Sequence, residues 1–418
     1  MTDYRPYPQY KPTNLDWLGE IPNQWKTVAL HYVGRLKSGE SITALQFNED
    51  GEYPVYGGNG FRGNYDRFTH DGDFVLIGRQ GALCGNINIA KGKFFASEHA
   101  IVVNPEWVFD TNWMGYQLLS MNLNQYSLSA AQPGLSAEVI GRLKIAFPPL
   151  DEQQAIARFL DFKTAQIDAL IAKKQTLLDK LAEKRMALIS HAVTKGLDAS
   201  VSMKDSGVAW LGEIPSHWTA KKLKYLGKTR YGLGEPPQKL EGGLPFIRAT
   251  DIYRGEIDGS RVQTVDPDFV PWSRNPALKA KDILVVRSGA YTGDSAIVPE
   301  CWAGCIAGYD MVFTADAALP EYLAYNLLSK HVLNGQIYLA KNRAAQPHLN
   351  SEELGGLVVA IPSEEEQAVI VTYLDKYIRH VAEQIEKVNS VIDRLKEYRS
   401  ALITNAVTGK IDVREWHE

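Results

Sequence analysis

The sequence lacks long apolar runs and has few cysteines. No stretch approaches the roughly 18 apolar residues that a transmembrane helix needs, and the opening MTDYRPYPQYKPTNLD has no apolar signal core. The three cysteines are an odd, sparse set that fits a reducing compartment. Cys301 and Cys305 have no second Cys or His pair nearby, so a zinc site is not expected. These absences predict a cytoplasmic protein with no membrane attachment.

The sequence also lacks a surplus of positive charge. Its 45 Lys and Arg residues stand against 49 Asp and Glu, a net charge of −4. Residues 15–147 hold 10 basic and 13 acidic side chains, and residues 208–361 hold 16 of each. Bulk charge therefore does not by itself indicate a nucleic-acid-binding protein.

Catalytic motifs are missing as well. Gly227-Lys228-Thr229 ends like a phosphate-binding P-loop, but Lys222 stands where the first glycine is required. There is no G-x-S-x-G, H-E-x-x-H or G-x-G-x-x-G. There is also no Asp/Asn-Pro-Pro-aromatic stretch of the kind that amino-methylating enzymes use on a flipped base. A non-catalytic chain is the favoured interpretation, with a self-contained modification enzyme as a rival.

What the sequence does contain is a tandem repeat. WLGEIP occurs at residues 17–22 and 210–215, and AAQP occurs at residues 130–133 and 344–347. From AAQP onward the copies align without a gap, with 28 identities in 69 pairs. The offsets, 193 and 214, place 21 extra residues of the second copy between the two motifs. The two copies are alike at their ends and differ in the middle. This pattern suggests two recognition domains on one shared scaffold, each recognising something different.

Each diverged middle is predicted to be rich in β-strands, and each tail is predicted to be one long helix. Short apolar runs at residues 74–77 and 283–286, bounded by Asp and Gly, are typical of buried strands. In the tails, apolar residues recur alternately every four and three positions from Leu160 and from Leu374, which is the seam of a coiled coil. Helices of about 65 Å cannot bury such stripes alone, so the two are expected to pack on each other and to set the distance between the globular domains.

The order of motifs resembles the specificity subunit of type I restriction–modification enzymes. The motifs are WLGEIP followed by Trp25 or Trp218, a diverged β-rich region, Gln-Pro-x-Leu, then Pro, Glu-Gln and a long helix, all present twice. The resemblance covers residues 15–412 and implies an α+β fold. Two β-rich target-recognition domains would each be followed by a long helix, and the helices would pack as an antiparallel coiled coil with pseudo-two-fold symmetry. The expected parts are residues 1–147 (N-terminal segment and first domain), 148–198 (first helical spacer), 199–361 (linker and second domain), 362–412 (second spacer) and 413–418 (C-terminal tail).

The resemblance also implies a function. Each domain would read one half of a bipartite, asymmetric site in double-stranded DNA, and the subunit would position its partners without catalysing anything. Those partners would be two methyltransferase subunits, which use S-adenosylmethionine to methylate adenine N6, and restriction subunits, with ATP and Mg on the partners and no cofactor on this chain. Because phosphate contacts carry much of DNA affinity, we expect the isolated, nearly neutral chain to bind DNA weakly. The alternative is a non-catalytic coiled-coil adaptor that binds proteins rather than DNA.

Candidate base-reading residues are polar side chains on glycine-flanked loops, because base edges are read by Arg, Lys, Asn, Gln, Ser and Thr. In the first domain they are Asn59, Arg62, Arg79, Gln80 and Gln132. In the second they are Arg248, Thr250, Arg287, Ser288, Arg343, Gln346 and His348. Arg79 and Arg287 match in position, which favours a common task, either a phosphate contact or a structural ion pair. Gln132 and Gln346 are also shared and equally fit a loop-fixing role, whereas the unshared Arg62, Gln80 and His348 better suit sequence choice.

Two further features carry expectations about structure. Arg185 and Arg399 fall on apolar seam positions, where a buried charge is costly unless it is paired. They are expected to bridge to acids of the facing helix, to fix its register or to contact a docked partner. In WLGEIP, the Trp and Ile are expected to pack, while the Gly and Pro turn the chain.

Overall fold

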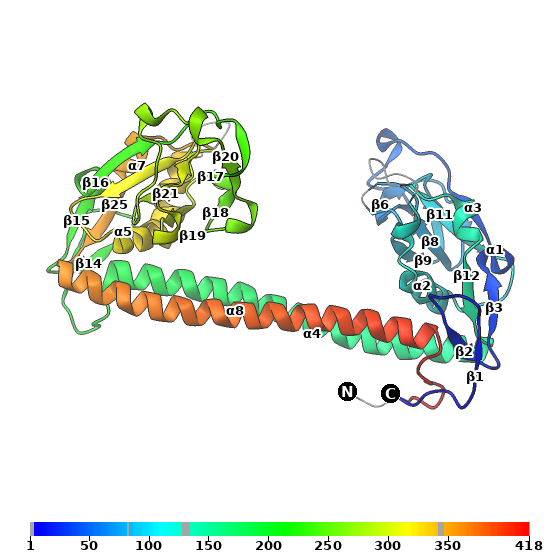
Figure 1. Cartoon of the computed structure of the whole chain (residues 1–418). Helices are drawn as coiled ribbons and strands as arrows, with labels where there is room; N and C mark the ends of the chain where they lie inside the picture. The colour runs from blue at the N-terminus through cyan, green and yellow to red at the C-terminus, as the bar shows by residue number, and fades with distance from the viewer. Residues whose placement is uncertain (1–3, 82, 128–133, 342–346, 418) are drawn as a thin grey trace. The chain divides into compact units, whose positions relative to one another are not determined.

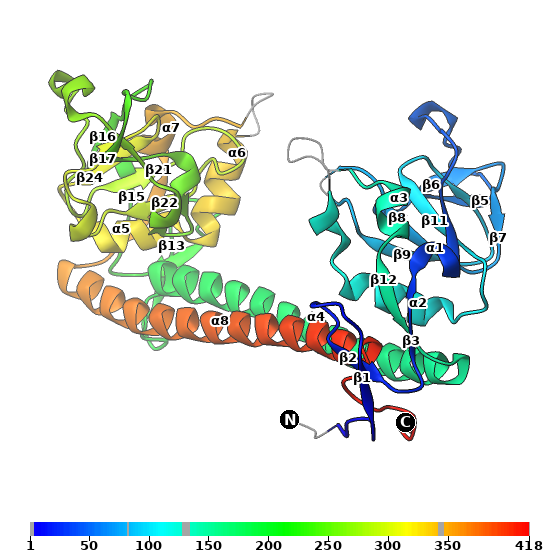
Figure 2. The same cartoon turned by 45° about the vertical axis from the view of Figure 1, so that its right-hand side comes forward.

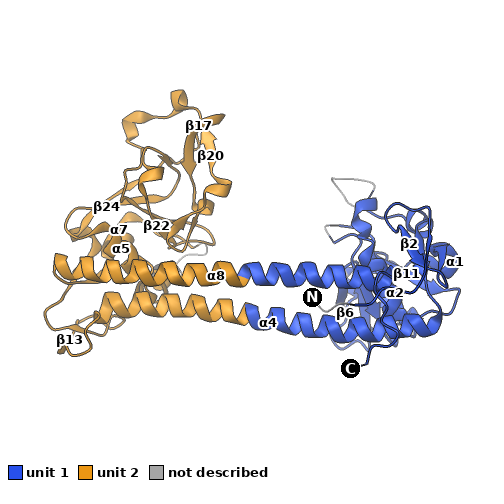
Figure 3. Ribbon diagram, turned by 60° about the horizontal axis from the view of Figure 1, so that its bottom comes forward, with its two compact units in different colours: residues 1–174, 389–418 blue, residues 175–388 orange. Residues whose placement is uncertain are grey.

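The computed structural model describes residues 4–81, 83–127, 134–341 and 347–417. The chain forms two compact units, unit 1 with residues 1–174 and 389–418 and unit 2 with residues 175–388 (Figure 3). Each unit combines a β-rich domain with a part of each of two long helices, α4 (Leu150–Lys195) and α8 (Glu364–Val407). In the described part of the chain, no helix is both long and apolar enough to cross a membrane.

Unit 1 is built on two four-stranded sheets. The first has the order β4-β11-β8-β9 and the second β6-β5-β10-β7, in which β5 and β10 run parallel. Helix α2 (Thr111–Ser120) packs on β8 and β9 (Figure 1). The strands are β1 (Tyr10–Pro12), β2 (Glu20–Pro22), β3 (Lys26–Ala29), β4 (Gly34–Ser38), β5 (Tyr53–Gly57), β6 (Gly60–Tyr65), β7 (His70–Asp71), β8 (Phe74–Gly78), β9 (Ile87–Ala90), β10 (Lys93–Ala96), β11 (Ala100–Pro105) and β12 (Lys144–Phe147). The short helices are α1 (Leu30–Val33), η1 (Ala44–Gln46), η2 (Leu123–Tyr126) and α3 (Ala137–Gly141).

Unit 2 repeats this plan with a longer connection. Its sheets have the orders β16-β24-β21-β22 and β20-β17-β23, and β17 and β23 again run parallel. Helix α5 (Pro320–Leu327) packs on β22 and β24 (Figure 2). The strands are β13 (Met203–Asp205), β14 (Glu213–Pro215), β15 (Thr219–Lys222), β16 (Gly227–Tyr231), β17 (Lys239–Ile247), β18 (Ile252–Tyr253), β19 (Glu256–Ile257), β20 (Gln263–Val265), β21 (Ile283–Val285), β22 (Ser295–Ile297), β23 (Ile306–Ala307), β24 (Met311–Ala315) and β25 (Val358–Ile361). The remaining short helices are η3 (Leu223–Tyr225), η4 (Ala249–Asp251), η5 (Gly259–Arg261), η6 (Pro267–Phe269), η7 (Trp272–Arg274), η8 (Glu300–Trp302), η9 (His331–Ile337), α6 (Tyr338–Lys341) and α7 (Ser351–Gly356).

The long helices pack on each other in opposite directions within each unit. In unit 1 the start of α4 shares a core with the end of α8, as Leu160 and Leu402 show. In unit 2 the end of α4 shares a core with the start of α8, where Val193 and Leu374 are buried together. Buried and half-buried residues recur along α4 at the predicted alternation of four and three. The predicted α+β class with an antiparallel pair of long helices is therefore confirmed.

The WLGEIP motif forms a turn and a short strand in both units. Leu18 and Ile21 are only 2% and 1% exposed, and Gly19 takes the left-handed conformation, with φ of 65°, that favours glycine. The expectation that the Trp packs was wrong, because Trp17 and Trp210 are 45% and 47% exposed. Trp17 lies at a central position of the turn that the N–H of Leu18 closes, and such a position projects its side chain outward. Leu18, the next residue in the chain, is buried instead.

The repeated Glu-Gln pair at the start of each long helix ties that helix to its domain. Gln153 is fully buried, accepts a hydrogen bond from the N–H of Asp110 and donates one to the carbonyl of Pro148, both at 2.9 Å. Gln367 makes the corresponding bonds in unit 2, with the N–H of Leu319 at 2.9 Å and the carbonyl of Pro362 at 3.1 Å. The shared glutamine is therefore part of the frame of both units.

Candidate nucleic-acid interface

In both units, a loop with corresponding backbone hydrogen bonds carries candidate residues. It follows a central strand of the first sheet, β8 in unit 1 and β21 in unit 2. The N–H of Leu135 donates to the carbonyl of Arg79 at 2.9 Å, and the N–H of Leu349 donates to the carbonyl of Arg287 at 2.7 Å. The structure therefore brings the segment that begins at Arg79 or Arg287 together with the segment after AAQP, although they are far apart in the sequence of each copy.

The next residues along this frame differ between the units. A β-bridge joins Gln80 to Gly134 in unit 1, and the corresponding bridge joins Ser288 to His348 in unit 2. We call these two bridged segments the paired loops. The backbone of the paired loops is common, but at these positions it presents an amide and no side chain in one unit and a hydroxyl and an imidazole in the other.

In unit 1 the candidates Asn59, Arg62 and Gln80 line a single shallow depression of about 400 Å³. The other residues around it are Gly58, Phe61, Leu83 and His99. Arg62 lies over the ring of Phe47 at 5.6 Å, and Asn59 accepts a hydrogen bond from the Asn86 amide at 2.8 Å. Three of the five predicted residues of this domain therefore share one surface.

Close backbone approach explains the glycines around this depression. Gly58 and Asn59 form the two-residue turn between β5 and β6, within the glycine-rich stretch of residues 57–60. A Cβ on Gly78 would lie 2.3 Å from the carbonyl oxygen of Gly58, so any larger residue would push the hairpin away from the paired loops. The hairpin therefore reaches Gln80 only because both contact points lack side chains.

In unit 2 the guanidinium of Arg287 contacts two tyrosine rings. Its guanidinium carbon is 4.7 Å from the ring centre of Tyr231 and 4.4 Å from that of Tyr309. It also contacts His348, with Nη2 at 3.2 Å from Nε2. Because a guanidinium can only donate, Nε2 accepts and the imidazole carries its proton on Nδ1. The two cation–π contacts and the bond to His348 restrict the orientation of this guanidinium.

A buried carboxyl lies beside Arg287. Asp310 is 2% exposed, and its Oδ1 accepts a hydrogen bond from the backbone N–H of Arg287 at 3.3 Å. Burial raises the pKa of Asp310 to about 6, and the nearby Arg287 opposes this shift only in part. Asp310 therefore changes its charge within the mildly acidic range while it contacts the loop that carries Arg287.

Two other candidates of unit 2 take part in a local ion pair. Arg248 binds the buried Asp251 through both carboxylate oxygens, with Nη2 to Oδ1 at 3.0 Å and Nε to Oδ2 at 3.1 Å. Thr250 donates to the same carboxylate at 3.2 Å. These contacts give both residues a structural role in the connection between β17 and β21, and DNA contact by either stays a prediction.

Three predicted residues lie outside the described part of the chain. They are Gln132, Arg343 and Gln346. Their described neighbours in sequence, Gly134 and His348, belong to the paired loops.

The seam arginines have different partners. Arg399 binds Asp168 of the facing helix through two bonds of 2.9 and 3.2 Å, which is the acid bridge that its position favours. Arg185 instead donates to the backbone carbonyl of Arg254 at 2.9 Å. In unit 2 the arginine therefore joins the helix to the β-rich domain rather than to an acid of the other helix.

The sequence interpretation missed the two tyrosines around Arg287. Tyr231 ends β16 and is followed by Gly232, and Tyr309 follows Gly308 and precedes β24. Both therefore have the glycine neighbour that marked the candidates, but aromatic side chains were not among the residue types expected to read base edges. Both also lie at the ends of adjacent strands of the sheet whose next strand leads into Arg287. Tyr309 is also 47% exposed, which suits an aromatic side chain that contacts a ligand.

The sequence and the fold are similar to those of known proteins. Residues 22–180 and 215–394 match the family described as type I restriction modification DNA specificity domain. The chain is 42% identical over 146 residues to the specificity subunit of the type I restriction enzyme EcoprrI from Escherichia coli, which covers 34% of this chain and 36% of that one. It is 24% identical over 429 residues to the EcoBI specificity subunit of the same species, with 95% and 88% covered. A solved structure from work on complex assembly and conformational transition of the type I R-M system has a TM-score of 0.68 at 15% identity, with 94% and 99% covered.

Proposed function

This chain belongs to the type I restriction–modification DNA specificity family, and on that basis we propose that it recognises a bipartite DNA site for a type I restriction–modification complex. Each unit reads one half of the site, and the two halves differ in sequence because the readers differ. The diverged regions recognise bases, and the repeated regions hold the diverged regions in place.

The observation that carries the proposal is the pair of loops with one backbone frame and different side chains. Gln80 and Ser288 occupy one corresponding position, and Gly134 and His348 occupy the other. A glutamine side chain can bond to both edge groups of adenine, whereas serine and histidine make single bonds to several bases. Two readers with the same loop frame and different side chains are what an asymmetric site requires.

Arg79 and Arg287 serve a common purpose on this frame. Both lie at the base of the paired loops, where their carbonyls accept corresponding backbone bonds. A phosphate contact is the same whatever the base sequence, so it is a task that two different readers share. We assign phosphate contact to these arginines and base reading to the side chains that differ.

The partners and their chemistry follow from the family. Two methyltransferase subunits bind this chain, carry S-adenosylmethionine and methylate adenine, and restriction subunits carry ATP and Mg. This chain performs no catalytic step itself. Because its units have no excess of basic residues, the partners also supply much of the positive charge that holds the DNA. Nanomolar, specific DNA binding by the isolated chain at physiological salt, measured by gel shift, would contradict this division of labour.

Single-molecule sequencing of methylated adenines in the host genome tests the proposed function. Deleting the gene should abolish methylation at one bipartite motif. Complementation with Gln80→Ala should relax the bases of one half-site only, and complementation with His348→Ala should relax the other half only. Gln154→Ala, an exposed change on α4, is the matched control and should restore the original motif. A motif that persists without the gene, or a variant that alters both half-sites equally, would overturn the assignment.

A further inference from the structure

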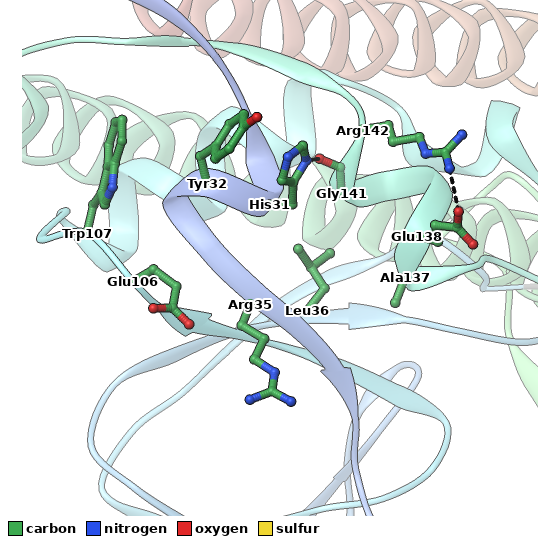
Figure 4. A pocket seen from close by; sticks show the side chains of 10 residues that line it. All are labelled: His31, Tyr32, Arg35, Leu36, Glu106, Trp107, Ala137, Glu138, Gly141 and Arg142. Carbon is green, nitrogen blue, oxygen red and sulfur yellow. Dashed lines mark hydrogen bonds and ion pairs between the residues drawn. The ribbon is translucent and has the colours of Figure 1, made fainter.

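A patch of exposed side chains away from the paired loops occurs in both units. In unit 1 it borders an open hollow of about 810 Å³ (Figure 4). We call it the tyrosine patch. Its members in unit 1 are His31, Tyr32, Arg35, Glu106 and Glu138. Figure 4 shows Tyr32 next to His31, whose Nδ1 donates to the carbonyl of Gly141 at 2.8 Å.

Backbone bonds identify the corresponding residues of unit 2. The N–H of Leu30 donates to the carbonyl of Leu143 at 2.9 Å, and the N–H of Leu223 donates to the carbonyl of Leu357 at 2.8 Å. Tyr32 and Tyr225 each stand two residues beyond these leucines. Further along, Glu106 and Asp316 each donate their N–H to the residue just after the tyrosine. The tyrosine patch of unit 2 therefore consists of Lys224, Tyr225, Lys228, Asp316 and Glu352.

The helix over the patch lies equally close in both units. A Cβ on Gly141 would lie 3.3 Å from the Cβ of His31, and a Cβ on Gly355 would lie 3.2 Å from the Cβ of Lys224. Gly141 is the last residue of α3 and Gly355 is the next-to-last residue of α7, and these short helices also carry Glu138 and Glu352. The same local packing therefore holds the acid close to the tyrosine in both units.

At the five named positions the chemistry is similar in both units, although all of these residues are exposed. Two other exposed residues that line the hollow of unit 1, Trp107 and Arg142, are not repeated in unit 2. Each copy has a nitrogen base or cation, a tyrosine, a second cation and two acids. Tyr32 and Tyr225 are 62% and 66% exposed. The buried leucines that precede them are shared because the core needs them, but the core places no demand on exposed side chains. Nearby exposed positions have diverged, as Trp107 and Ala317 show.

The two units differ in the bases that they read but share the same exposed side-chain chemistry at this patch. This likeness points to one kind of partner that binds to both units. Base reading would require the patches to differ. Phosphate binding would suit a common surface, but the acids of each patch offset its cations, and in unit 1 Glu138 forms an ion pair with Arg142 (Figure 4). Neither patch therefore has the surplus of positive charge that phosphate binding needs. An exposed tyrosine with charges of both signs around it instead matches the anatomy of a protein interface, with an aromatic anchor and a charged rim.

We propose that the tyrosine patch of each unit docks one methyltransferase subunit. This inference rests on the proposed function, because it takes the repeated partner from it. Tyr32 and Tyr225 are the anchors, and the acids and cations around them orient the partner through complementary charges. Like surfaces on the two units then give two equivalent binding sites.

The test uses the full chain and the methyltransferase subunit of its complex. Native mass spectrometry and calorimetry compare wild type, Tyr32→Ala, Tyr225→Ala and the double variant. Each single variant should keep one normal site and weaken the other by about tenfold or more, as expected for a tyrosine anchor. Glu138→Lys and Glu352→Lys reverse a rim charge and should weaken the same site as the tyrosine change in that unit. Tyr253→Ala, which removes a tyrosine that is 54% exposed elsewhere, is the matched control and should leave both sites unchanged.

Several outcomes would overturn the inference. One is a double variant that binds two methyltransferase subunits with wild-type affinity, as judged against Tyr253→Ala with an unchanged melting temperature in all variants. Normal assembly with weakened DNA binding would assign the patch to DNA, and loss of self-association alone would assign it to a second copy of this chain. Failure of the proposed function has a different signature, since the wild-type complex would then assemble but methylate no bipartite site.

Discussion

Replacing Gln153 with alanine tests whether the repeated glutamine holds the first reader on its helix. The side chain is fully buried and makes two bonds of 2.9 Å, one with the N–H of Asp110 and one with the carbonyl of Pro148. Removing it leaves both backbone groups without that partner, at a cost of about 1–3 kcal/mol for each group. The free energy of unfolding should therefore fall by about 2–6 kcal/mol.

Calorimetry and hydrogen exchange measure this effect together. A domain of 150–250 residues loses about 2–4 °C in melting temperature per kcal/mol, so the transition that contains unit 1 should fall by at least about 4 °C. The amide of Asp110 should also exchange faster. Gln154→Ala removes the same side chain from the adjacent, exposed helical position and should leave both measurements unchanged. If the two variants melt at the same temperature, the two bonds do not hold the domain as we infer.

Three further changes test other parts of the structure. Ile21→Ala should lower the free energy of unfolding by about 2–5 kcal/mol in urea titrations, whereas the exposed Trp17→Ala should change it by less than about 1 kcal/mol. Equal losses in the two variants would contradict the finding that Ile21 is buried and Trp17 is exposed. A double-mutant cycle on Arg399 and Asp168, both partly exposed, should give a coupling below about 1 kcal/mol, and a coupling above about 2 kcal/mol would show a buried pair. Because the folded-state pKa of Asp310 is raised to about 6, ionisation opposes folding, so stability is lost as pH rises from about 4 through 6. Asp310→Asn should remove that loss in melts between pH 4 and 7, and a variant with the wild-type pH profile would contradict it.

Local patterns predicted the elements that have strong periodicity. The alternation of four and three from Leu160 predicted a long helix with a buried seam, and α4 and α8 carry it. The apolar run at residues 74–77 predicted β8 because a strand between two others is buried on both faces. Such features can be read from sequence because each depends mainly on near neighbours in the chain.

The features that sequence did not predict depend on distant contacts. Nothing near Arg287 in sequence shows that Tyr231 and Tyr309 both contact its guanidinium. The exposure of Trp17 was missed because hydropathy favours burial, while the turn position decides the outcome. The ion pair of Arg248 had a readable signal, an aspartate three residues later, but an arginine on a loop fits a base contact equally well in sequence alone.

The matched residues of the two copies fall into three groups, according to whether they are shared and whether they are buried, and each group has its own physical role. Shared and buried residues, such as Gln153 and Gln367, maintain the frame, since a change there breaks bonds in the folded chain. Residues that differ and are not buried, such as the exposed Gln80 and the half-buried Ser288, can vary because the core of the unit does not depend on their side chains. Shared and exposed residues need an external reason, because the fold does not require them and asymmetric reading would make them diverge. The exposed Tyr32 and its counterpart meet that condition, so a partner common to both units is the simplest cause of their likeness.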